Sequence, residues 1–496
     1  MKVLRVLAGL LALVWLAAAW SGSAQHKVNG GIPLSDISDE AYKLAMHAQD
    51  RLDLADFWTS NRAAREAVEV DPDSLFAWIS LANASASFPE FSEAIKKASA
   101  LKSTGTRGEQ LWIDLNATFL DNNAEKRLQL AEALVGEYPE SPRAWVILAG
   151  VQTGRGSYAD ARKSNDKAIE LDSHMAAAYT ANGFSYMFNQ PVDANRSETY
   201  MARAAKLRPE EASVWINLGD SYRAQSKLAD SREAYTKAMN LNGKNEVAPI
   251  KRGHVNSFLG NFEEARADYD KGVELGQASA VPNLANYRAF VNLYADDPKG
   301  AVVELEGVLK AIDDMDMADD EKNGTRIFTL QNMATICFHS DMTDDAENAI
   351  ARLTAAYTAN ADASNDAGVA RQMKAGATYW EGRLAAREGD FETAVGKAEK
   401  YAEILKDDQN PRRMENYHDL LGLVNLLQGN YNEAIAHYNK ANLDPSGGIW
   451  SKYHLAVALD KADRKTEAGE LFSEVANYNF NSVGFALVRK DAGSRT

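Results

Sequence analysis

The stretch that decides the fold lies near the middle of the chain and reads Trp215-x-x-Leu218-Gly219-x-x-Tyr222, followed by Ala238. The same order of large and small residues recurs on both sides of it. The recurrences are Trp145 and Ala149, Tyr179 and Gly183, Gly253 and Ala265, and, near the C-terminus, Gly422, Ala434, Tyr438 and Ala441. Self-similarity at a period of a few tens of residues indicates a repeat architecture.

The glycines of this pattern have a physical meaning. Glycine in the middle of a helix costs about 1 kcal/mol relative to alanine. A sequence accepts that cost where a neighbouring helix must come close, and we therefore expect Gly183, Gly219 and Gly422 at helix–helix contacts. We expect large residues such as Trp145 and Trp215 to fill the space between the helices of a pair, and small ones such as Ala238 to admit the next repeat.

These residues resemble the tetratricopeptide repeat family, whose unit is two antiparallel helices in about 34 residues. The resemblance implies an all-α fold, an α-solenoid of helix pairs that forms a right-handed superhelix. Alignment on the first large residue of each unit predicts up to twelve helix pairs. They start near Leu44, Trp78, Gln110, Trp145, Tyr179, Trp215, Pro249, Ala285, Leu330, Thr378, His418 and Lys452.

The N-terminal segment is typical of a secretory signal peptide. Lys2 and Arg5 precede an apolar run over residues 6–20, and Gly22 and Ala24 supply small residues for cleavage. The run is shorter than the roughly 20 residues that span a bilayer. The sequence thus predicts a periplasmic or secreted protein, with an uncleaved membrane anchor as the alternative.

The sequence divides into five parts. We predict a signal peptide over 1–24, a linker over 25–37, a regular array over 38–275, a less regular array over 276–478 and a C-terminal cap or tail over 479–496. Wide spacings near residues 313–325 and 355–372 indicate extended turns or longer helices. The tail over 479–496 either caps the last repeat or pairs with another subunit. We expect the protein to be a monomer.

Composition narrows the function. Lysine and arginine number 54 against 70 aspartates and glutamates, a net charge of −16, and nucleic-acid binding normally needs a basic footprint. The single cysteine, Cys337, excludes an internal disulfide. No catalytic, metal-binding or cofactor-binding motif is present, so we predict a protein that is not an enzyme and has no cofactor.

The resemblance also implies a binding surface, because the first helices of such pairs line a concave groove. Carried over position by position, the predicted groove residues are Asn217, Asp220, Arg223, Lys251, His254, Tyr287, Asn332, Tyr379, Trp380, Arg383 and Arg387. Amide and guanidinium groups mixed with aromatic rings suit a protein or peptide ligand. The basic members favour an acidic tail or chain terminus.

The leading hypothesis is a non-enzymatic protein–protein interaction scaffold of the cell envelope. One alternative is an accessory factor for envelope polymer export or outer-membrane biogenesis. The other is an enzyme with a solenoid body and an unrecognised active site.

Overall fold

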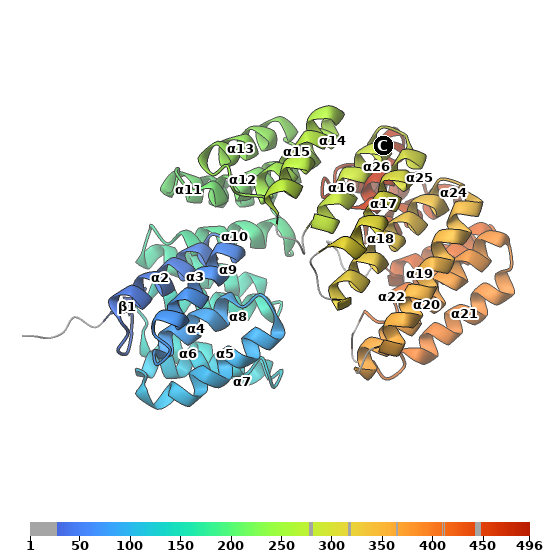
Figure 1. The fold of residues 1–496 in the computed structure, drawn as a ribbon. Helices are drawn as coiled ribbons and strands as arrows, with labels where there is room; N and C mark the ends of the chain where they lie inside the picture. Colours follow the sequence, from blue (N-terminus) through green and yellow to red (C-terminus); the bar gives the residue numbers. More distant parts are fainter. Residues whose placement is uncertain are drawn as a thin grey trace, which may run out of the picture. The chain divides into compact units, whose positions relative to one another are not determined.

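The computed structural model describes residues 27–276, 281–315, 319–363, 366–408, 410, 412–441 and 448–496. These residues fold into α-helices that pair in chain order (Figure 1). Among them, no helix is both long enough and apolar enough to cross a membrane.

Twelve helix pairs follow one another, and every predicted repeat start lies in the first helix of a pair. The first helices are α2 (Asp39–Asp53), α4 (Leu75–Ala84), α6 (Arg107–Ala117), α8 (Pro142–Gly154), α10 (Ala176–Phe188), α12 (Ala212–Ala224), α14 (Val247–Leu259), α16 (Val281–Tyr294), α18 (Asp319–His339), α20 (Ala367–Glu388), α22 (Glu415–Leu427) and α24 (Ile449–Lys461). The second helices are α3 (Phe57–Val70), α5 (Phe88–Leu101), α7 (Ala124–Glu137), α9 (Tyr158–Leu171), α11 (Ala194–Leu207), α13 (Leu228–Leu241), α15 (Phe262–Leu275), α17 (Pro298–Ala311), α19 (Thr343–Ala363), α21 (Phe391–Ile404), α23 (Tyr431–Ala441) and α25 (Lys465–Ala476). A last helix, α26 (Val483–Ser494), follows the twelfth pair, and short 3-10 turns, η1 (Lys102–Thr104) and η2 (Ile312–Asp314), end two of the repeats. The predicted all-α repeat fold is confirmed.

Local sequence signals start many of these helices. The Ser74 hydroxyl accepts a hydrogen bond from the Ala77 amide at the start of α4. Thr106 and Glu109 form a reciprocal capping box at the start of α6. Such caps satisfy amides that have no partner within their own helix.

The small residues lie where the two helices of a pair meet most closely. A Cβ atom on Gly219 would lie 2.5 Å from the ring of Tyr235, and one on Gly422 would lie 2.8 Å from the ring of Tyr438. Both tyrosines are almost fully buried. Glycine therefore makes room for an aromatic ring of the second helix, as the cost of mid-helix glycine predicts.

Two of the large residues of the pattern are only partly buried. Trp145 and Trp215 are half-buried, and the Trp145 indole donates to the Pro139 carbonyl at 2.8 Å. Trp145 thus covers the turn before its helix, and both tryptophans also pack against the hydrophobic core. The rest of the pattern is buried, namely Ala149, Tyr179, Gly183, Leu218, Ala238, Gly253, Ala265, Ala434, Tyr438 and Ala441, whereas Tyr222 is half-buried.

The predicted linker contains structure. Strands β1 (Val28–Asn29) and β2 (Ile32–Pro33) form an antiparallel hairpin, and the Ser141 hydroxyl donates to the Gly30 carbonyl at 2.5 Å. Ser35 donates to Glu109 through its backbone amide at 2.9 Å. This segment is therefore packed onto the first repeats.

The wide spacings of the second half arise from longer helices in the described residues. Helices α18, α19 and α20 have 21, 21 and 22 residues, whereas α3, α5, α7, α9 and α11 have 14 residues each. Between extended turns and longer helices, the described residues therefore show longer helices. Residues 316–318 and 364–365, which fall in the wide spacings, lie outside the described residues.

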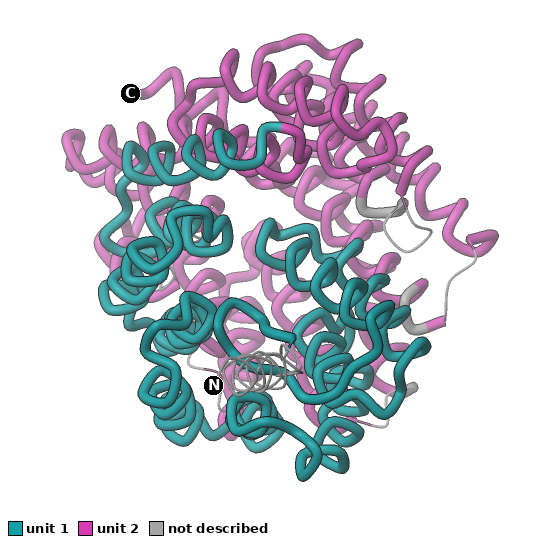
Figure 2. The backbone as a smooth tube through the Cα atoms, turned by 90° about the vertical axis from the view of Figure 1, so that its left-hand side faces the viewer, with its two compact units in different colours: residues 1–209 teal, residues 210–496 magenta. Residues whose placement is uncertain are grey.

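The chain packs as two compact units, residues 1–209 and 210–496 (Figure 2). Each unit has its own hydrophobic core. We call them unit 1 and unit 2. This division follows packing, whereas the predicted boundary at residue 275 concerned the regularity of the repeat and stays a prediction.

Candidate functional site

Unit 1 contains a large apolar cavity on the side formed by its first helices. The cavity has a volume of about 930 Å³, and α2, α4, α6, α8 and α10 all contribute to its wall. Its lining includes Leu52, Trp112, Val146, Ile147 and Phe184. We call it the unit 1 groove. Its volume lies at the upper end of the range of ligand pockets, about 300–1,000 Å³.

Aromatic rings at the edge of the unit 1 groove are exposed. Phe57, Phe88 and Phe119 line it and are 63%, 68% and 49% exposed. Phe91 lies between them, with ring centroids 6.5 Å from Phe88 and 6.1 Å from Phe119. Clustered exposed apolar rings mark interaction sites in soluble proteins.

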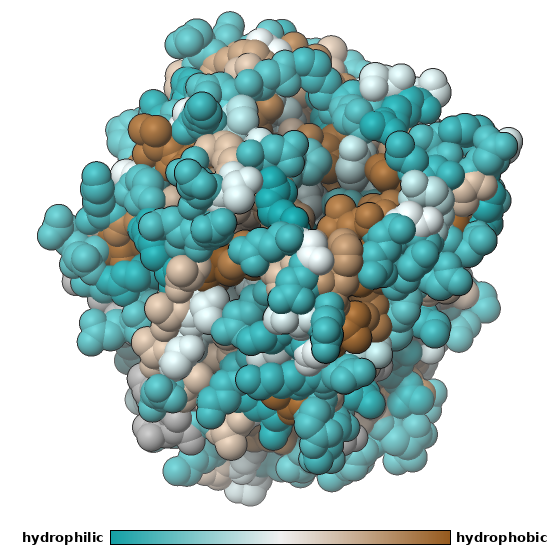
Figure 3. Space-filling model, turned by 90° about the vertical axis from the view of Figure 1, so that its right-hand side faces the viewer, coloured by the Kyte–Doolittle hydropathy of each residue, from teal (hydrophilic) through white to brown (hydrophobic). Residues whose placement is uncertain are grey.

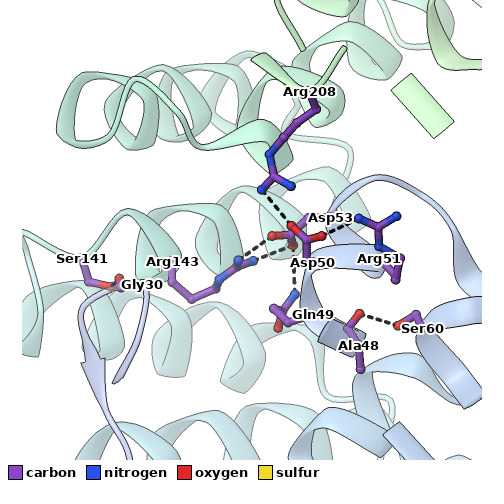
Figure 4. Close-up of polar contacts among 10 residues, drawn as sticks. All are labelled: Gly30, Ala48, Gln49, Asp50, Arg51, Asp53, Ser60, Ser141, Arg143 and Arg208. Atoms are coloured by element: carbon purple, nitrogen blue, oxygen red, sulfur yellow. Dashed lines mark hydrogen bonds and ion pairs between the residues drawn. The ribbon is translucent and has the colours of Figure 1, made fainter. Parts of the chain in front are cut away.

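One wall of the groove is polar, and its charges are matched (Figure 4). Arg143 of α8 donates two hydrogen bonds to Asp53 of α2, at 2.8 and 2.6 Å. The Gln49 amide donates to the same carboxylate at 2.9 Å. Because this wall presents a neutral pair, the groove offers a ligand apolar surface and no unmatched charge.

A second acidic residue connects the ends of unit 1. Arg208, at the end of α11, donates to Asp50 at 2.8 Å, and Arg51 donates to its other oxygen at 2.6 Å (Figure 4). Burial alone would raise the pKa of Asp50, but the bonds from Arg51 and Arg208 outweigh it and leave the pKa below its usual value. The carboxylate therefore stays charged and joins the first and fifth helix pairs.

The sequence analysis did not identify the unit 1 groove. Phe57 and Phe88 are the first residues of α3 and α5, and Phe119 follows the end of α6. Large apolar residues at turn positions were the available signal, because turns are normally polar.

The residues predicted to bind a partner lie in unit 2 and form two clusters. In the first, Asp220 accepts from Arg223 at 3.0 Å and from the Tyr235 hydroxyl at 2.7 Å, and also pairs with Lys251. His254 lies 2.7 Å from the Tyr269 hydroxyl, and its ring meets that of Tyr287 at 4.8 Å. Burial lowers the pKa of His254 well below its ordinary value, with Arg223 and Lys251 adding to the effect, so the ring is neutral.

The second cluster surrounds Arg383. Its Nη1 donates to the Tyr379 hydroxyl at 2.6 Å and to Asp419 at 3.2 Å, and the Trp380 ring lies 5.3 Å from the guanidinium carbon. Asn332 donates to Asn286 at 2.9 Å, and Arg387 pairs with Asp341 at 3.0 Å.

Most of these predicted residues are buried. Asn217, Asp220, Arg223, His254, Asn332, Tyr379, Trp380 and Arg383 are between 3% and 8% exposed, whereas Lys251, Tyr287 and Arg387 are half-buried. The face of the molecule in Figure 3 is largely hydrophilic, with apolar groups between the polar ones. A binding role for the predicted residues stays a prediction.

The C-terminal segment covers the first cluster. The Phe480 ring lies 4.7 Å from the Arg223 guanidinium carbon, and the Asn481 amide nitrogen lies 3.0 Å from His254 Nδ1. Further on, Arg489 donates to the Phe258 carbonyl at 2.8 Å, and Phe485 is fully buried. Helix α26 packs on α24 and α25, and it also contacts α14, α16 and α18 of the same unit. Its role as the cap of the last repeat stays a prediction.

Comparison with known proteins agrees with this repeat geometry. Models of the tetratricopeptide repeat match residues 128–176, 193–241 and 250–276. These segments of the chain therefore contain tetratricopeptide repeats. Proteins of this kind are protein–protein interaction scaffolds and generally not catalysts.

Several curated proteins resemble parts of the chain. Anaphase-promoting complex subunit 3 of Schizosaccharomyces pombe is 27% identical over 194 residues, 39% of this chain and 28% of that protein. Superkiller complex protein 3 of Mus musculus is 25% identical over 38% of this chain and 12% of its own length. The chloroplastic protein PYG7 of Arabidopsis thaliana is 30% identical over 21% of this chain and 36% of its own length. The matches thus span about a third of these relatives or less.

Among solved structures, the tetratricopeptide repeat protein YrrB is 18% identical and matches 36% of this chain and 91% of its own, with a TM-score of 0.30. MamA of Desulfovibrio magneticus is 17% identical over 34% of this chain and 94% of its own, also with a TM-score of 0.30.

Proposed function

We propose that this chain is an exported interaction scaffold whose first unit binds an apolar segment of a partner protein in the unit 1 groove. The observation that carries the proposal is a cavity of about 930 Å³ bordered by exposed phenylalanines. Exposing such rings to water is unfavourable by roughly 25 cal/mol per Å² of apolar surface, and a partner that covers them recovers this energy.

The chemistry of the groove indicates what the partner presents. The Asp53 carboxylate matches the Arg143 charge, so the ligand needs no compensating charge at that wall. The Asn116 amide likewise donates to Asn83 at 2.9 Å. An amphipathic helix that inserts aliphatic or aromatic side chains spaced three to four residues apart suits a groove of this kind.

Phe57→Ala combined with Phe88→Ala is expected to weaken partner capture by at least about tenfold, because buried aromatic anchors carry a large share of binding energy. The free protein should keep its helicity, since both rings are more than half exposed. Capture is measured by crosslinking in the native cell followed by quantitative identification of the crosslinked proteins.

Trp58→Ala is the matched control, because Trp58 is 47% exposed on the same helix as Phe57 but does not line the groove. It should leave capture unchanged. Equal capture by the double variant and the wild type would rule out the groove as the binding site.

Export is the second element of the proposal. The composition of residues 1–24 supports a signal peptide, and β1 begins at Val28, so cleavage after Ala24 leaves the folded part intact. N-terminal sequencing of protein from the cell envelope is expected to begin at Gln25. An intact Met1 in membrane-bound protein would instead support the anchor, and an intact Met1 in cytoplasmic protein would contradict export.

A further inference from the structure

The first helices of unit 1 present the same repeat position to the unit 1 groove. Each of α2, α4, α6, α8 and α10 contributes one residue to its wall, and consecutive members lie one repeat, about 34 residues, apart. The five residues are Gln49, Asn83, Asn116, Gly150 and Phe184. The first three carry carboxamides, so an otherwise apolar groove has a polar wall on three helices.

Asn83 and Asn116 bond to each other, and each keeps an open amide atom. The Asn116 Nδ2 donates to the Asn83 Oδ1 at 2.9 Å. The Asn83 Nδ2 and the Asn116 Oδ1 have no partner among the described residues, and neither atom is sealed off from solvent. Turning both amides over reverses the bond but still leaves one donor and one acceptor open.

These open atoms belong to the groove. Asn116 is only 5% exposed and lines the groove, so the small accessible part of its side chain lies at the groove wall. Gln49, which is 7% exposed, adds a second acceptor there. Its Nε2 donates to Asp53 at 2.9 Å, and its Oε1 has no partner in the described part of the chain (Figure 4).

The open amide atoms restrict what a bound segment can present to them. Water satisfies them in the free protein, but an apolar segment that enters the groove displaces this water. A polar group that loses its hydrogen bonds to water without gaining others weakens the complex. A carboxamide offers both a donor and an acceptor, whereas a carboxylate offers only acceptors and an ammonium group only donors.

We propose that the segment bound in the unit 1 groove carries an asparagine or glutamine on its apolar face, and that this carboxamide pairs with Asn83 and Asn116. The apolar side chains of the segment pack at Gly150 and Phe184. The inference rests on the function proposed for unit 1 and adds a specificity to it.

A displayed library of short amphipathic helices tests the preference, with the full chain as bait. The apolar face of each peptide consists of leucine and phenylalanine, and each of its positions is varied in turn to every amino acid. Binders should be enriched in asparagine or glutamine at one position. The same peptides with leucine or glutamate there should bind at least about tenfold more weakly, because the groove amides are then left unpaired. Fluorescence anisotropy of labelled peptides measures the affinities.

Asn83→Leu combined with Asn116→Leu tests which residues recognise the carboxamide. The change replaces both amides by apolar groups of similar size and leaves neither partner unpaired. The variant should reverse the preference and bind the leucine peptide at least about tenfold more tightly than the carboxamide peptide. If it does not fold, Asn83→Leu alone, at a half-buried position, should lose the carboxamide preference.

Gly150→Leu tests the location. A Cβ atom on Gly150 would meet no atom within 4 Å, so a leucine side chain extends into the groove and should weaken binding of the selected peptides at least about tenfold. Gly136→Leu on α7 is the matched control. An added Cβ also meets nothing within 4 Å there, but Gly136 does not line the groove, and this variant should bind like the wild type.

The outcomes separate this inference from the proposed function. Binders without a carboxamide preference, or an unchanged preference after Asn83→Leu with Asn116→Leu, would overturn the inference and leave the groove as a binding site. Failure to select any peptide whose binding Gly150→Leu weakens would contradict the proposed function of the groove, and this inference with it.

Discussion

Asp220→Ala is expected to lower the free energy of unfolding of unit 2 by about 3–5 kcal/mol, the usual cost of breaking a buried ion pair from one side. Asp220 is 4% exposed and balances two cations, Arg223 and Lys251, while accepting from Tyr235. Its removal leaves both positive charges in the protein interior with no counter-charge from this residue. Denaturant unfolding followed by circular dichroism measures the loss.

Two control variants test whether the loss of stability comes from the buried ion pair. Glu467→Ala breaks the exposed pair with Arg464 and should cause no comparable loss. Replacing Asp220, Arg223 and Lys251 together by leucine and methionines removes all three charges and should recover most of the stability, because apolar replacements of buried ion pairs are often neutral. A loss below about 1 kcal/mol for Asp220→Ala alone would show that the pair contributes like a surface salt bridge.

The same carboxylate predicts a pH dependence. Burial would raise the pKa of Asp220, but Lys251 and Arg223 outweigh it and bring the pKa below the ordinary value of 3.8. For an acid whose pKa is lowered by folding, the stabilisation is complete above the unfolded pKa and disappears as pH falls through the folded pKa. The stability difference between wild type and Asp220→Ala should therefore be constant near neutral pH and shrink below about pH 4.

Deletion of residues 477–496 is expected to have an effect of similar size. Phe485 and Val488 are fully buried, and burying a side chain of this kind contributes about 1.5–3 kcal/mol. The deletion thus removes at least about 3–6 kcal/mol and uncovers the first cluster, from which Asn481 and Phe480 are lost. Compared with the full chain, the truncated protein is expected to have a lower unfolding midpoint for unit 2 and to bind more of a hydrophobic dye.

A chain that ends at Ser494 is the control, since it keeps α26 complete and should unfold like the full protein. A peptide of residues 477–494 added to the truncated protein should bind and reverse the dye signal. Unchanged unfolding and no dye binding after deletion would show that the segment contributes little to unit 2.

The repeat could be predicted because its signals are local. Gly219 and Tyr235 lie on adjacent helices, and the ring fits only where no Cβ is present. Each helix pair therefore has a recognisable pattern of small and aromatic residues in a short stretch of sequence, and this pattern recurs along the chain. Trp145 and Trp215 pack against the core and are half-buried, a degree of burial that the repeat pattern does not specify.

The binding surfaces could not be predicted, because they depend on residues far apart in the chain. The Arg143–Asp53 pair joins positions 90 apart, and the contact of Asn481 with His254 joins positions 227 apart. No local pattern tells an exposed groove residue from one covered by the C-terminal segment. The predicted set in unit 2 accordingly contains residues that the structure buries, and Phe57 and Phe88 were overlooked.

The sequence by itself predicted up to twelve helix pairs and the starts of those in the described residues, because a helix pair is specified by residues within a few tens of positions of one another. The tertiary structure decided that the unit 1 groove is open and that the C-terminal segment covers the first cluster of unit 2. That outcome depends on how successive pairs curve until distant residues meet, as Arg208 meets Asp50 in unit 1 and Asn481 meets His254 in unit 2. Curvature is a sum of small packing angles between repeats, and it is expressed only in the folded chain.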